Sequence, residues 1–330
     1  MRLPVEPEPV EGFSAKKIVA AIDEAGGQKR PGPAGKAEPE ATKGTLKAEN
    51  ALKTIMEPLA GFPFVSGADL AAALAAVLTV LVRLCLPKVP LFGITAPEKG
   101  SGKSLLADAI ALIGTGLKCT LIPYSHDAEE VRKSLFTHAL KGTSVLNFDN
   151  IATTFKGDFL CALLTSTTID DRILGASKSV TAPNVMTILA TGNNLTIAGD
   201  LTTRALLILT TRALLIQIDA EMEKPEERHF EIDLTRWIPE NRARLVTAGL
   251  TILRAYHLAG RPKPDWKEFG RFEDWSNLVR GALVWLDTED PLATRRGLAD
   301  ADSRNREPGS GIDGLARPVR RCADNGGRGY

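Results

Sequence analysis

The sequence has few cysteines and no excess of charge of either sign. Its 4 cysteines lie far apart with no CxxC spacing, which argues against a zinc site and a disulfide framework and favours reducing, cytoplasmic surroundings. The net charge is +1, from 41 basic and 40 acidic side chains. Affinity for nucleic acid could therefore come only from a local cluster of Lys and Arg, because the overall charge supplies none.

The sequence also lacks a hydrophobic run long enough for a membrane span. Its most apolar stretch, residues 70–86, contains Thr79 and Arg83 and is shorter than the roughly 20 residues that a span needs. We expect a buried helix there and no membrane partner. The first residues include glutamates where a secretory signal has basic residues, so we expect no export signal.

Changes in composition divide the chain into four expected segments. Pro, Gly, Lys and Glu dominate the first, and Gly, Arg, Asp and Pro dominate the last, so neither should form a core. Between them, short apolar runs alternate with segments of helical spacing, which predicts an α/β fold with a parallel sheet flanked by helices. The expected segments are a disordered or linker-like 1–51, an α/β core 52–231, a helical subdomain 232–300 and a disordered tail 301–330.

Three apolar runs of the core are predicted to be buried strands: residues 89–95, 143–148 and 185–190. Each run is followed by polar or glycine residues. Parallel α/β sheets place their ligands at the carboxyl ends of the strands. We therefore expect functional residues at these three ends.

A glycine-rich loop follows the first run and precedes a helical segment; it reads Pro97-Glu98-Lys99-Gly100-Ser101-Gly102-Lys103-Ser104. In such a loop, consecutive backbone N–H groups converge on phosphate oxygens at a helix N-terminus. Lys103 is expected to reach the β- and γ-phosphates of ATP, and the Ser104 hydroxyl to ligate Mg²⁺. The expected nucleotide-binding residues are Gly100, Ser101, Gly102, Lys103, Ser104 and Leu105. The alternative is a chance glycine-rich turn, and Pro97 stands where the usual pattern has its first glycine.

Asp149 ends the second predicted strand, where it could hold Mg²⁺ directly or through water. The alternative is a cap or turn residue. Many related ATPases have a glutamate next, as the base for the attacking water, but this chain has Asn150. An asparagine can orient a water and cannot take its proton. Either hydrolysis is slow or another carboxylate helps, and Glu98, Glu129 and Glu130 are candidates.

Asn193 and Asn194 end the third predicted strand. A side-chain amide at this position could orient the lytic water beside the γ-phosphate. Asparagine also tolerates the left-handed conformation of a tight turn, so the two residues could simply form that turn. The sequence leaves both interpretations open.

An octapeptide, residues 201–208, is repeated without change as residues 209–216. Arg204 in the first copy is a candidate arginine finger, which would stabilise charge on the γ-phosphate of a neighbouring subunit. The duplication gives it a double, Arg212. Arg204 keeps its spacing in the sequence from Asn194, whereas Arg212 keeps its spacing from the segment after the repeat. We favour Arg204 as the finger. An insertion of even length leaves every later residue of a strand on its original face.

Basic residues flank a glycine turn between the second and third predicted strands. A hairpin there would present Arg172 and Lys178 as contacts to a nucleic-acid backbone. Two charges make a weak patch, and an ordinary solvated hairpin is an equally good interpretation. The four tryptophans are expected to pack within the helical segment rather than to stack on bases.

The order of these motifs resembles that of the ATPase domains of phage- and plasmid-encoded primase-helicase proteins. Those domains are similar to superfamily 3 helicases within the AAA+ class of P-loop NTPases, and the resemblance covers about residues 55 to 300. It implies a homo-oligomer, a hexamer with ATP at the subunit interfaces. It also implies that Asn193 or Asn194 is the polar residue of the third motif, Arg204 the finger, and Arg172 with Lys178 the hairpin facing DNA.

Two features depart from the family pattern. Relatives tend to carry two adjacent arginines where this chain has Thr203 and Arg204, and the octapeptide is duplicated. The resemblance as a whole leads us to expect an ATP-binding, Mg²⁺-dependent motor domain of a helicase or translocase, acting on single-stranded or forked DNA in phage or plasmid replication. The alternatives are a non-motor ATP-binding switch or assembly module, and a decayed remnant with impaired hydrolysis.

Overall fold

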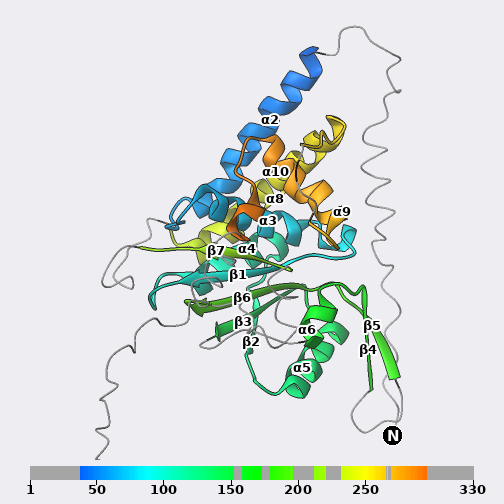
Figure 1. Ribbon diagram of the computed structural model, residues 1–330. Coiled ribbons are helices and arrows are strands. Elements are labelled where there is room, and N and C mark those ends of the chain that lie inside the picture. Colours follow the sequence, from blue (N-terminus) through cyan, green and yellow to red (C-terminus); the bar gives the residue numbers. More distant parts are fainter. Residues whose placement is uncertain are drawn as a thin grey trace, which may run out of the picture.

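A five-stranded parallel sheet lies at the centre of the fold, in the order β2-β3-β6-β1-β7 (Figure 1). The computed structural model describes residues 38–151, 158–172, 179–195, 212–220, 232–264, 266 and 269–295. The strands are β1 (Leu91–Ala96), β2 (Thr120–Pro123), β3 (Val145–Ile151), β6 (Thr187–Asn193) and β7 (Ala213–Gln217). All six residues of β1 are buried, as expected of a central strand that is covered on both faces.

Helices cover the sheet on both sides (Figure 1). On one side lie α3 (Gly67–Leu81) and α4 (Lys103–Thr115), with α2 (Glu38–Met56) and α8 (Leu234–Leu258) packed outside them. On the other side lie α5 (Ala128–Leu140) and α6 (Asp158–Leu163). This arrangement confirms the predicted α/β fold with a parallel sheet flanked by helices.

The apolar stretch of residues 70–86 forms a buried helix, as predicted, although the helix is shorter than the stretch. Ser66 caps α3, since its Oγ accepts a hydrogen bond from the Asp69 backbone N–H at 3.2 Å. The helix ends at Leu81, and a short 3-10 turn, Arg83–Cys85, follows before Pro87. In the part of the chain that the structure describes, no helix has the length and apolar character needed to cross a membrane.

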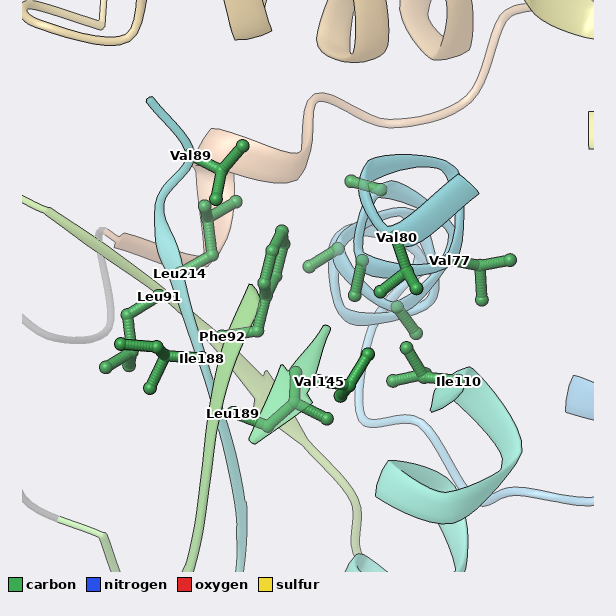
Figure 2. Close-up of a cluster of buried hydrophobic side chains, with 14 of the residues drawn as sticks. Val77, Val80, Val89, Leu91, Phe92, Ile110, Val145, Ile188, Leu189 and Leu214 are labelled. Atoms are coloured by element: carbon green, nitrogen blue, oxygen red, sulfur yellow. The ribbon is translucent and has the colours of Figure 1, made fainter. Parts of the chain in front are cut away.

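The core lies between α3 and the sheet (Figure 2). Val80 of α3 points toward Ile110 of α4, and Phe92 of β1 belongs to the same buried cluster. The two helices approach closely at Gly114, where an added Cβ would lie 2.2 Å from Val80 Cγ1. A residue larger than glycine at position 114 would therefore push the helices apart.

The helices of the C-terminal part share this core. They are α8, α9 (Glu273–Trp275), a π-helical turn (Ser276–Arg280) and α10 (Gly281–Trp285). Trp275 is fully buried and its Nε1 donates to Thr79 Oγ1 at 2.8 Å, so this tryptophan packs in the core that the helical segment shares with α3. The α8 helix begins at Leu234, where Asp233 caps it, and Pro239 lies inside it.

The boundaries predicted near residues 52 and 232 do not coincide with breaks between helices and core. Helix α2 runs across Leu52, and Ala48 on it is already fully buried. Helix α8 packs directly on α2 and α4. The extents of the segments before residue 38 and after residue 295 lie outside the described residues and stay predictions.

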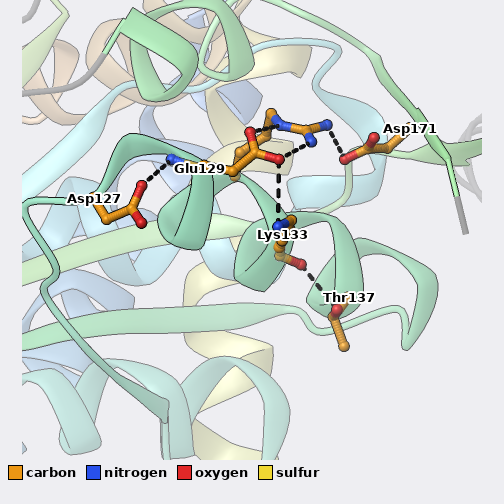
Figure 3. A network of polar contacts seen from close by, with 6 residues as sticks. Asp127, Glu129, Lys133, Thr137 and Asp171 are labelled. Carbon is orange, nitrogen blue, oxygen red and sulfur yellow. Dashed lines mark hydrogen bonds and ion pairs between the residues drawn. The ribbon is translucent and has the colours of Figure 1, made fainter. Parts of the chain in front are cut away.

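A two-stranded antiparallel hairpin stands outside the main sheet. It consists of β4 (Thr168–Arg172) and β5 (Ser179–Pro183), at the place where the sequence predicts a hairpin. Arg132 of α5 anchors it: the guanidinium forms an ion pair with Asp171 and also donates to both carboxylate oxygens of Glu129, at 2.9 and 2.6 Å (Figure 3). The tip, including Lys178, and the side chain of Arg172 lie outside the described residues.

Candidate functional site

The glycine-rich loop connects the end of β1 to the start of α4. Gly100 and Gly102 have φ angles of +76° and +93°, a left-handed conformation that strains residues with a Cβ. Gly102 is the residue before α4, and its carbonyl accepts the first helical hydrogen bond, from Leu106 N–H at 2.9 Å. The N–H groups of the first turn of α4 therefore point out of the helix toward the loop, as an anion site requires.

Two side chains of the loop fold back onto one carbonyl. Ser101 Oγ donates to the Glu98 carbonyl at 2.7 Å, and Lys103 Nζ donates to the same oxygen at 2.8 Å. Ser101 is buried, so its hydroxyl stabilises the loop rather than pointing outward. Burial lowers the pKa of Lys103 from its ordinary value, and the nearby carboxylates of Asp149 and Glu98 oppose that shift.

The expected metal ligands, Ser104 and Asp149, lie next to each other. Ser104 Oγ, from the first turn of α4, donates to Asp149 Oδ1, on β3, at 3.1 Å. Among the described residues, no group of three or more His, Cys, Asp or Glu is placed to hold a metal by itself. Mg²⁺ is commonly bound through one or two protein oxygens together with substrate phosphates and water, so a hydroxyl and a carboxylate fit an ion that arrives with a nucleotide.

Asn150 follows Asp149 in a left-handed conformation, with φ +53°. Its backbone N–H donates to Thr191 Oγ1 at 3.4 Å, and the register between β3 and β6 shifts at this point. Such irregularities re-aim side chains at the ends of strands. The side chain at position 150 is exposed.

The structure separates the two asparagines at the end of β6. Asn193 is the last residue of β6 and pairs with Ala96, at the start of the glycine-rich loop. Because strand side chains alternate, Asn193 lies on the same face of β6 as Thr191. Asn194 adopts φ +45° and its N–H donates to the Ala96 carbonyl at 3.0 Å. The turn interpretation therefore applies to Asn194, and Asn193 is the residue on the Asp149 side.

Arg212, the second of the duplicated arginines, does not lie at the loop. Arg212 directly precedes β7, and its carbonyl accepts from Leu91 N–H at 3.0 Å, which places it at the opposite end of the strands. Because strands rise about 3.3 Å per residue, the length of β1 places the start of the glycine-rich loop about 20 Å from Arg212. The Arg212 side chain is 6% exposed and its guanidinium donates to the Cys161 carbonyl. Arg204 lies outside the described residues.

The two candidate bases on α5, Glu129 and Glu130, both accept hydrogen bonds from neighbouring side chains. Hydrogen bonds from Arg132 lower the pKa of Glu129 to about 2, which makes it a weak base. Glu130 accepts a hydrogen bond from Ser125 Oγ at 2.5 Å. Of the three candidates, Glu98 lies closest in sequence to the loop, since it belongs to it.

The sequence interpretation missed Thr191, which is 1% exposed and donates to Asp149 Oδ1 at 2.6 Å. Asn147 of β3 also contacts it, through Nδ2, at 3.4 Å. A signal was present: polar residues recur with a period of two in otherwise apolar strands, at Asn147 and Asp149 and at Thr191 and Asn193.

A scan of protein-family models finds no match to this chain, and a search of curated proteins finds none either. A functional assignment must therefore come from the site itself.

Proposed function

We propose that this chain binds Mg-ATP through the loop of residues 97–104 and is a P-loop NTPase. The observation that carries the proposal is the 3.1 Å contact between Ser104 and Asp149 beside two glycines of positive φ. A hydroxyl at a helix N-terminus and a carboxylate at the end of a neighbouring strand are the two protein groups that such a site uses around Mg²⁺.

Each residue then has a distinct role. Backbone N–H groups of residues 100–105 bind phosphate oxygens, and Lys103 exchanges its bond to the Glu98 carbonyl for the β- and γ-phosphates. Ser104 and Asp149 hold the metal ion, which when bound neutralises charge on the phosphates. Asn193, on the Asp149 side of β6, orients the attacking water.

The same residues support slow turnover. No carboxylate follows Asp149, and the amide of Asn150 accepts no proton. Glu129 is held ionised by Arg132, so it does not replace the missing base. Glu98 remains as the candidate base.

We further propose that this ATPase is a motor domain of a DNA helicase or translocase. The order of the motifs supports this, as does the β4–β5 hairpin that Arg132 and Asp171 fasten to α5. Arg172 and Lys178 flank the turn of that hairpin in the sequence and supply its positive charge for single-stranded or forked DNA. Arg204 acts on the ATP of the next subunit of a ring-shaped homo-oligomer.

Nucleotide binding is tested by titrating a fluorescent ATP analogue into the purified chain. Lys103→Ala should weaken binding at least about tenfold, because a hydrogen bond to a charged group contributes about 1.5–3 kcal/mol. Lys118→Ala is the matched control, since Lys118 is a solvent-exposed lysine that pairs only loosely with Asp108, at 3.7 Å. Equal affinity in both variants would refute the site.

Hydrolysis with and without single-stranded DNA separates a motor from a second candidate, a non-motor switch whose nucleotide controls assembly. The position of Asn150 favours that candidate. A switch should change its mass in solution on adding ATP, with negligible turnover and no response to DNA. A motor should hydrolyse ATP faster when DNA is present. A chain that melts without cooperativity would instead indicate a decayed remnant.

A further inference from the structure

A buried threonine joins the two strands that carry the proposed site. Thr191 of β6 is 1% exposed, and its hydroxyl donates to Asp149 Oδ1 at 2.6 Å. Ser104 donates to the same oxygen at the longer distance of 3.1 Å. Since hydrogen bonds to a carboxylate are stronger than those between neutral groups, Thr191 holds Asp149 firmly from the buried side.

The Thr191 oxygen also accepts two hydrogen bonds from β3. One comes from the Asn150 backbone N–H and one from Asn147 Nδ2, each at 3.4 Å. A single hydroxyl therefore contacts the residue two positions before Asp149, Asp149 itself and the residue after it. Fixing these three contacts fixes the direction in which the carboxylate leaves the strand.

Asn147 is a costly residue for its position. It is fully buried in a central strand, and within the described part of the structure its Oδ1 has no hydrogen-bond partner. An apolar side chain would avoid the penalty of a buried, unsatisfied amide oxygen. The contact that an apolar residue could not supply is the one from Nδ2 to Thr191.

We propose that Thr191 is a positioning residue for Mg²⁺ binding at Asp149, with Asn147 as its support. This inference rests on the proposed function. Ser104 belongs to the loop that receives the phosphates, whereas Thr191 belongs to a core strand. Its hydrogen bond therefore orients Asp149 whether or not the loop holds a nucleotide, and the metal ion meets a carboxylate that is already in place.

The experiment measures binding rather than turnover. A fluorescent ATP analogue is titrated into the full chain in EDTA and then at increasing MgCl₂. The Mg²⁺ midpoint is the Mg²⁺ concentration at which half of the change in nucleotide affinity has occurred. Thr191→Val keeps the shape and removes the hydroxyl. It should leave the affinity in EDTA unchanged and raise the Mg²⁺ midpoint about tenfold or more, the usual effect of losing a group that orients a metal ligand. Thr191→Ser, which keeps the hydroxyl, should restore the midpoint.

The same substitution elsewhere on β6 is the matched control. Thr187 is fully buried on the same strand face, and its Oγ1 has no hydrogen-bond partner among the described residues. Thr187→Val should leave the Mg²⁺ midpoint unchanged. Urea unfolding checks that each variant folds, and Thr191→Ala, which adds no atoms, replaces Thr191→Val if that variant does not.

Two outcomes would overturn the inference. The first is an Mg²⁺ midpoint in Thr191→Val or Thr191→Ala equal to that of the unaltered chain. The second is an equal shift in Thr187→Val. If the unaltered chain bound no nucleotide in either EDTA or MgCl₂, the proposed function would fail together with the inference, whereas normal binding with an unchanged midpoint would remove the inference alone.

Discussion

The turn that follows Asn193 depends on one hydroxyl, and the removal of that hydroxyl should have a measurable cost. Thr95 of β1 is 5% exposed, and its Oγ1 accepts a hydrogen bond from Leu195 N–H at 2.8 Å. Thr95→Val preserves volume and leaves this buried N–H without a partner. An unsatisfied buried donor costs about 1–3 kcal/mol. No cavity forms, so this cost is the whole expected effect on the free energy of unfolding.

Urea unfolding followed by circular dichroism measures that cost. With an m-value of about 3 kcal/mol/M, a loss of 1–3 kcal/mol lowers the midpoint by about 0.3–1 M. Thr187→Val is the control, because that buried hydroxyl has no partner among the described residues and its removal should leave stability unchanged or raise it. Equal midpoints for Thr95→Val and Thr187→Val would refute the reasoning. If Asn193 orients the water, Thr95→Val should also lower kcat more than ATP affinity.

Three further substitutions test other contacts. Arg83 is buried, and its guanidinium donates to the carbonyls of Met186, Leu86 and Asn184 at 2.9, 2.6 and 2.8 Å. Arg83→Met should therefore lower the free energy of unfolding by at least about 3 kcal/mol. The control is Arg254→Met, which changes an exposed arginine and should lower it little. Arg132 lowers the pKa of Glu129 from 4.5 to about 2, so the stabilisation is complete above pH 4.5 and is lost as the pH falls toward 2. Unfolding midpoints of Glu129→Gln and the unaltered chain should therefore converge over that range. Burial raises the pKa of Asp69 above 3.8, so the pH dependence has the opposite sign: the contribution of Asp69 to stability is lost as the pH rises above 3.8. Asp69→Asn should therefore gain stability relative to the unaltered chain as the pH rises above that value.

Segments with both a cap and a clear periodicity could be predicted from the sequence. Helix α5 is such a segment: it spans Ala128–Leu140, and Asp127 Oδ1 at its start accepts from Glu129 N–H at 2.9 Å. The strand expected at residues 89–95 is observed at Leu91–Ala96. The edge strand β2 gave no signal, because it has four residues and only Ile122 among them is buried. A strand this short has no periodicity to detect.

Part of the candidate site could be predicted because its residues belong to local patterns. The glycines, Lys103 and Ser104 form one continuous motif, and Asp149 ends an apolar run. For Thr191 the local signal, a recurrence of polar residues with a period of two, was weak, since threonine is common in strands for its shape alone. Its role depends on register: Phe148 pairs with Ala190, which brings Asp149 opposite Thr191. Register is a property of two strands together, and one strand sequence does not contain it.

The duplicated octapeptide also shows that the sequence of one strand does not determine its place in the sheet. Its two copies have identical propensities, so no local property decides which of them forms β7. The structure uses the second copy, and the residues that follow it explain the choice. Gln217 N–H donates to Asp69 Oδ1 at 2.8 Å and Ile218 N–H to the Thr95 carbonyl at 3.0 Å, and Ile218 is fully buried. The first copy is followed by Leu209 and Thr210 instead, and Thr210 would bring a hydroxyl to the site of a buried isoleucine. Tertiary contacts after the strand therefore select the copy, and they place Arg212 directly before β7.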